Sequence, residues 1–124
     1  MINVSDQEFN DILAAALDSL PEERVRGLQN VLVTYEDEPT PEQLHKQGVR
    51  HGSELLGLYE GIPLTKRGIG YNMVLPDKIT IFKNPILRVT RGKAAFVQQV
   101  RKTLWHEIAH YYGLDHSQIH KLEK

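Results

Sequence analysis

The eleven residues from His106 to His116 place the tightest constraint on how this chain can fold. They match the zinc-binding pattern H-E-x-x-H, extended by G-x-x-H. On a helix, His106 and His110 lie on one face and can share one metal ion. Gly113 can adopt a left-handed conformation, which ends the helix and lets the chain turn back toward the metal. The pattern therefore predicts one zinc ion held by His106, His110 and His116, with a fourth position open to water as in a catalytic site.

Glu107 is the predicted catalytic residue. It lies about 100° round the helix axis from His106, so it can reach a metal-bound water without being a ligand. The surrounding sequence supports a helix from residue 93 to residue 112. Its apolar stripe is formed by Val97, Val100, Leu104 and Ile108. On a helical wheel the two histidines of the H-E-x-x-H pattern fall nearly opposite this stripe, away from the core.

The rest of the chain predicts a mixture of helices and strands. Ser5 and Glu8 predict the start of a helix that stops at Pro21. Further helices are predicted from Pro41, capped by Thr40, and at residues 117–123, capped by Asp115. Alternating apolar residues predict strands at residues 28–35, 55–59 and 78–83, the last broken by Asn84-Pro85. The expected fold class is α+β, with a small mixed sheet of about three to four strands packed by two main helices.

The length predicts one domain spanning residues 1–124, and we expect a monomer. Fifteen basic and sixteen acidic side chains give a net charge of −1, so no strong field attracts nucleic acid or an anionic membrane. The absence of cysteine excludes disulfides and thiolate metal ligands. The first residues show no signal peptide, and no apolar run is long enough to span a membrane. We therefore expect a cytoplasmic protein.

With these motifs, and with the segments at residues 59–65 (YEGIPLT) and 75–82 (LPDKITIF), the chain resembles the small bacterial zincin-like metallopeptidases. The resemblance covers about residues 5–122. It implies a minimal metzincin-like domain, Zn²⁺ as cofactor, His106, His110 and His116 as ligands, and Glu107 as general base. One departure concerns the methionine turn that larger metzincins place after the third histidine. Both methionines of this chain, Met1 and Met73, precede the motif.

The resulting expectation is a zinc metallopeptidase that hydrolyses peptide bonds through a zinc-bound water and a glutamate base. By analogy with other zincins, a peptide or protein substrate is expected to add as a strand to an edge formed by residues 78–83. Candidate oxyanion partners are Tyr71, Tyr111 and Tyr112, although packing is the commoner role for aromatic residues near a helix end. Asp115 remains an alternative third ligand.

Two other functions remain open. A metal-dependent endoribonuclease would use a similar three-histidine spacing and the basic cluster Arg88, Arg91, Lys93, Arg101 and Lys102, which otherwise predicts a solvated face. The presence of Glu107 and the near-neutral charge argue against nucleic acid. The second alternative is a zinc-stabilised binding module with little turnover. It rests on the eight residues after His116, which are too few to build the second wall of a cleft.

Overall fold

A three-stranded mixed sheet forms the centre of the fold in the computed structural model, which describes residues 2–49, 52–68, 70–71, 75–114, 117–118 and 121. The elements are, in chain order, α1 (Asp6–Ser19), α2 (Glu22–Arg26), β1 (Val31–Glu36), α3 (Pro41–Lys46), β2 (Gly57–Glu60), the 3₁₀ turn η1 (Leu64–Lys66), β3 (Asp77–Phe82), α4 (Lys83–Val89) and α5 (Lys93–Tyr111). The α+β class, the mixed sheet and the two main helices, α1 and α5, are confirmed.

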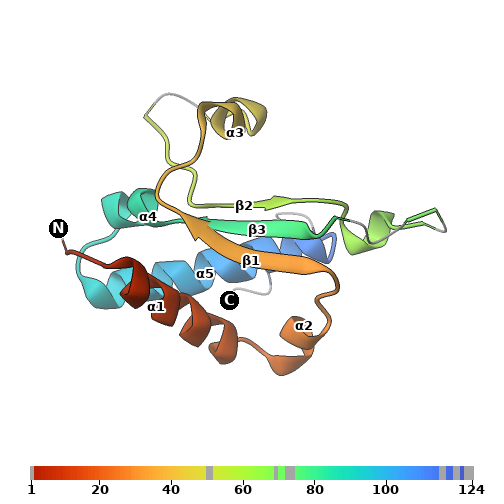
Figure 1. The fold of residues 1–124 in the computed structure, drawn as a ribbon, viewed down its shortest axis with the longest axis horizontal. Helices are drawn as coiled ribbons and strands as arrows, with labels where there is room; N and C mark the ends of the chain where they lie inside the picture. Colours follow the sequence, from red (N-terminus) through yellow and green to blue (C-terminus); the bar gives the residue numbers. More distant parts are fainter. Residues whose placement is uncertain are drawn as a thin grey trace.

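The strand order is β1-β3-β2, with β1 parallel and β2 antiparallel to β3. The prediction that residues 78–83 form a sheet edge is therefore wrong, because β3 is the central strand. All of its residues except Lys78 are buried, so this strand has a neighbour or a packed layer on every side. Sequence alternation identifies a strand but not its neighbours, which depend on distant segments. The free edges belong to β1 and β2 (Figure 1).

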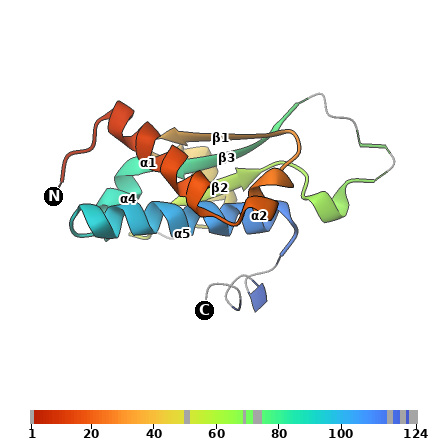
Figure 2. The same cartoon turned by 90° about the horizontal axis from the view of Figure 1, so that it is seen from below.

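Helices α1 and α5 pack together on one face of the sheet (Figure 2). Phe9 of α1 joins the layers, since its ring lies 4.7 Å from that of Tyr35 on β1 and 5.7 Å from that of Phe96 on α5. Three residues of the expected stripe of α5, Val100, Leu104 and Ile108, are completely inaccessible, whereas Val97 is 37% exposed. This packing leaves the opposite side of α5 available for the histidines.

Local signals explain where several helices begin. The Ser5 hydroxyl accepts a hydrogen bond from the Glu8 N–H, and Thr40 forms a reciprocal capping box with Gln43. The predicted end of the strand at Asn84-Pro85 is confirmed, because β3 ends at Phe82, but the chain continues directly into a helix, α4, that was not predicted. Pro85 is the third residue of α4, where a missing N–H costs nothing because first-turn donors have no partner in the helix. The predicted helix at residues 117–123 lies mostly outside the described residues.

Helix α3 lies beyond the β2 edge of the sheet, within the excursion that joins β1 to β2 (Figure 1). Both ends of this excursion meet Arg88 of α4. The guanidinium donates to the Glu38 carboxylate at 2.7 and 2.8 Å and to the Glu54 carboxylate at 2.5 and 2.9 Å. Among the described residues, no helix is long and apolar enough to cross a membrane.

Candidate metal centre

The last two turns of α5 bring three potential ligands together. His106, Glu107 and His110 each offer an atom that lies within 4.8 Å of the others. The two imidazole rings are 4.8 Å apart and nearly perpendicular, as expected for residues one helical turn apart. Both histidines are half-buried, whereas Glu107 is only 7 % exposed. Neutral imidazoles are ligands that zinc prefers, so the two described histidines fit the metal that the motif predicts, and the Glu107 carboxylate lies beside them.

The side chain of Glu107 extends from α5 toward strand β2. Burial raises the pKa of its carboxyl group to about 7, and a hydrogen bond from the backbone of Tyr59 opposes part of that rise. A carboxyl group with this pKa can both accept and release a proton near neutral pH. Its burial on the side facing β2 was not predictable from helical spacing, because it depends on a strand that comes about fifty residues earlier.

Strand β2 can approach α5 this closely because residue 57 is glycine. A β-carbon at Gly57 would lie 2.6 Å from the Thr103 side chain and 3.3 Å from Glu107. The Phe82 N–H donates to the Leu56 carbonyl, so in an antiparallel ladder the backbone groups of Leu56 and Leu58 face β3. Those of Gly57 and Tyr59 therefore point away from β3, and the Tyr59 N–H meets Glu107.

A buried ion pair holds this end of β2 in place. Arg67 lies 2.5 Å from the Asp77 carboxylate, with side chains 6 % and 5 % exposed, and the Tyr59 hydroxyl donates to the same carboxylate oxygen. Burial and this hydrogen bond to Asp77 raise the pKa of Tyr59. Arg67 also donates to the Ile62 carbonyl. The pair was not anticipated from the sequence, which has no periodic signal linking residues 59, 67 and 77.

A groove runs along β2 past these residues. One hollow of about 340 Å³ lies beside the two histidines and Glu107, with Gln47, Leu58, Tyr59 and Pro63 among the residues that line it. A second, of about 360 Å³, adjoins His106 and Glu107 on the side of Gly57 and Thr103. A third, of about 230 Å³, continues toward Gln43 and Lys46 of α3. The second wall of the cleft thus comes from the β1–β2 excursion. From the sequence, only the residues after His116 were considered as a source for this wall.

Two of the predicted site positions cannot be placed. His116, the predicted third ligand, and Asp115, its alternative, lie outside the described residues. The turn that leads to them has the expected form, since Gly113 has a φ of 82° and a β-carbon there would collide with the Thr65 side chain. Only glycine combines this conformation with such a close approach.

The candidate tyrosines are not among the residues that line these three hollows. The Tyr111 hydroxyl accepts from the Gln29 N–H and donates to the Gly27 carbonyl, and the Tyr112 hydroxyl donates to the Arg24 carbonyl. The ring of Tyr71 lies under the Arg67 guanidinium. Tyr111 and Tyr112 therefore have packing roles, which contradicts their use as oxyanion donors, whereas the Tyr71 hydroxyl is buried and has no hydrogen-bond partner among the described residues.

The basic cluster is not one free surface. Arg88 binds two glutamates, Lys93 binds Glu8, and Arg101 donates to the Ser19 hydroxyl. Three of its five members are therefore engaged with neighbouring side chains.

The profile of the zincin-like metallopeptidase family matches residues 28–124. The chain belongs to the zincin-like metallopeptidase family. Its structure is also similar to that of a conserved hypothetical protein from T. thermophilus, with a TM-score of 0.60 and 25% sequence identity over 88% of this chain and 94% of the other. No curated protein matches the chain. The zincin-like assignment confirms the resemblance found in the sequence.

Proposed function

We propose that this zincin-like protein is a zinc-dependent peptidase in which His106, His110 and His116 hold the metal and Glu107 is the general base. The observation that carries the proposal is the position of Glu107. Its buried carboxyl group adjoins both described histidines and faces an open groove along an edge strand. Zinc bound there would lower the pKa of water and polarise the scissile carbonyl.

The groove suits an extended peptide. The outward backbone groups of Gly57 and Tyr59 can pair with a substrate strand added beside β2, while α3 and Gln47 bound the other side. The substrate edge is therefore β2, in place of the edge expected at residues 78–83. A substrate strand would compete with Glu107 for the Tyr59 N–H, which frees the carboxylate to accept the proton of the attacking water. Glu107 then delivers that proton to the leaving amine.

Incubation of the zinc-loaded protein with unstructured peptides and with RNA, each with and without a chelator, tests the proposal. We expect chelator-sensitive peptide cleavage and intact RNA. Glu107→Gln should retain zinc but lower kcat by about 10²–10⁴-fold, because the amide cannot accept the proton. Glu36→Gln is a matched control, since Glu36 is an exposed residue of β1, the other edge strand. Equal peptide cleavage by Glu107→Gln and the parent would remove Glu107 from the mechanism.

Zinc stoichiometry after dialysis tests the ligands. We expect His110→Ala to lose zinc, while His45→Ala, which removes an exposed histidine of α3, should keep it. His116→Ala should weaken zinc binding, whereas His116→Asp should retain zinc, since both imidazole and carboxylate bind it. If Asp115→Ala releases zinc and His116→Ala does not, Asp115 is the third ligand.

A further inference from the structure

The hollow on the N-terminal side of His106 has a chemical character of its own. Its floor is formed by Leu55, Leu56 and Gly57, and its polar side chains come from α5. These are Gln99, Lys102 and Thr103, in addition to His106 and Glu107. Apart from these two members of the metal centre, Lys102 is the one charged residue among those that line the hollow.

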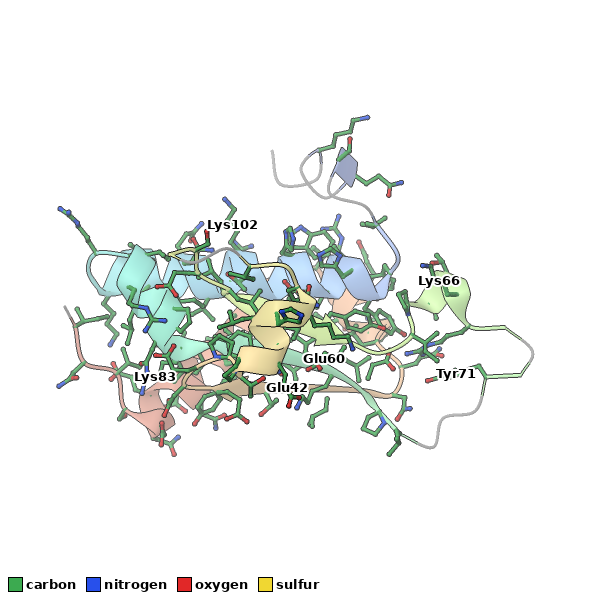
Figure 3. The ribbon with its side chains drawn as sticks, turned by 90° about the horizontal axis from the view of Figure 1, so that it is seen from above. Glu42, Glu60, Lys66, Tyr71, Lys83 and Lys102 are labelled. Carbon is green, nitrogen blue, oxygen red and sulfur yellow. The ribbon has the colours of Figure 1, made fainter. Side chains whose placement is uncertain are left out.

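Lys102 is an exposed cation on the rim of this hollow. Within the described part of the chain it forms no ion pair, whereas Lys93 on the same helix binds Glu8 at 2.8 Å. Figure 3 shows Lys102 projecting from α5 toward solvent. The ammonium group is therefore available to a ligand that enters the hollow.

The helix places Lys102 in line with the metal centre. Lys102, His106 and His110 follow one another at intervals of four residues and share one face of α5. Four residues correspond to about 6 Å along a helix axis, whereas neighbouring residues of an extended peptide are about 3.4 Å apart. A peptide beside β2 would therefore bring a group one or two residues from the reacting bond to Lys102.

We propose that this hollow is a carboxylate-binding subsite, in which Lys102 binds the carboxylate and the leucine floor contacts the methylene groups that carry it. The inference rests on the proposed peptidase function and names the class of substrate: peptides with an anionic group close to the scissile bond. Two sources supply that group, an Asp or Glu side chain and the free C-terminal carboxylate of a short peptide. A single ammonium group on an exposed stem suits one carboxylate and cannot provide a bidentate arrangement.

The test compares kcat/KM for peptides that carry Glu, Gln or Lys at each position flanking the cleaved bond, with free and with amidated C-termini. We expect about a fivefold preference for Glu over Gln, the upper range for an exposed ion pair. The preference should shrink as NaCl rises from about 0.05 to 0.5 M, because salt screens such pairs. A preference for free over amidated ends would identify the terminal carboxylate as the source instead.

Two variants isolate Lys102. Lys102→Gln should reduce the Glu-to-Gln ratio to about one, and Lys102→Glu should favour Lys-containing peptides. Lys93→Gln is the matched control, because nine residues separate the two lysines and place them on opposite faces of α5. Cleavage without any preference for a carboxylate, or a preference that Lys102→Gln retains, would overturn the subsite and leave the peptidase proposal intact.

If the zinc-loaded parent cleaves no peptide, the peptidase proposal fails and the subsite is decided by binding. The fluorescence anisotropy of labelled peptides would then be measured with zinc-loaded Glu107→Gln and with the double variant that also carries Lys102→Gln. Tighter binding of carboxylate-bearing peptides to the first protein alone supports the subsite. Equal binding of Glu and Gln peptides, or an equal preference in both proteins, overturns it.

Discussion

Replacing Glu107 by glutamine should stabilise the metal-free protein at high pH, even though it removes the proposed catalytic base. The carboxyl group is buried between α5 and β2, and this burial raises its pKa to about 7 from an ordinary value of 4.5. Between these two pH values the folded protein holds a proton that the unfolded chain has released. The free energy of unfolding therefore falls as the pH rises through this interval, and the loss is complete above pH 7.

The size of the effect follows from the same two pKa values. Each tenfold difference in proton affinity is worth about 1.4 kcal/mol, so ionised Glu107 costs the fold about 3 kcal/mol at pH 8. Glutamine is neutral at every pH and can still accept the Tyr59 N–H. The difference in unfolding free energy, variant minus parent, should therefore be near zero below about pH 4, reach about 1 kcal/mol at pH 5 and approach about 3 kcal/mol at pH 8.

Urea unfolding of both proteins in the presence of a chelator, at intervals between pH 5 and pH 8, measures this difference. Both proteins keep His106 and His110, whose contributions largely cancel in the comparison. Glu36→Gln, which replaces an exposed carboxylate on β1, should show no such trend. A difference for Glu107→Gln that stays within about 0.5 kcal/mol from pH 5 to pH 8 would refute the reasoning, because it would mean that burial does not disfavour the ionised form.

Other perturbations test the surroundings of the metal centre. Asp77→Ala should lower the free energy of unfolding by about 3–5 kcal/mol in urea, because the guanidinium that it binds is left buried without a counterion. Gly113→Ala should cost about 1–3 kcal/mol, since residue 113 has a positive φ and contacts Thr65. Gly48→Ala, at a positive φ but in open space, should cost less, and equal losses would exclude a role for the contact. Zinc should raise the Tm of the parent but not that of His110→Ala.

Local signals explain which parts of the fold were predictable from the sequence. Ser5 and Thr40 begin helices through hydrogen bonds to residues three positions later, and such contacts are visible in any short segment. The helical spacing of His106 and His110 belongs to the same class, because helix geometry alone brings them together. The structure retains the spacing of the two histidines because the apolar residues of α5 pack against the sheet and leave the histidines on another face of the helix.

Features that depend on distant segments were not predictable in the same way. Analogy with other zincins placed residues 78–83 at a sheet edge, yet strand β3 is central because β1 and β2 pair with it from both sides. The Arg67–Asp77 pair and the burial of Glu107 against Tyr59 arise from these pairings. Pro85 correctly predicted the end of the strand, but it did not show that a helix follows, in which proline is tolerated because it falls in the first turn.

Both ends of the β1–β2 excursion are attached to Arg88, and this affects which changes in sequence length the protein can tolerate during evolution. Because Glu38 and Glu54 meet the same guanidinium, the excursion leaves and rejoins the body at nearly one point. A loop with adjacent ends can change length cheaply, since each doubling of a flexible loop costs only about 0.6 kcal/mol in closure entropy. Insertions and deletions between these two glutamates would leave the sheet, α5 and its histidines undisturbed. Evolution can therefore reshape one wall of the groove, and with it substrate choice, while the residues that hold the metal remain unchanged.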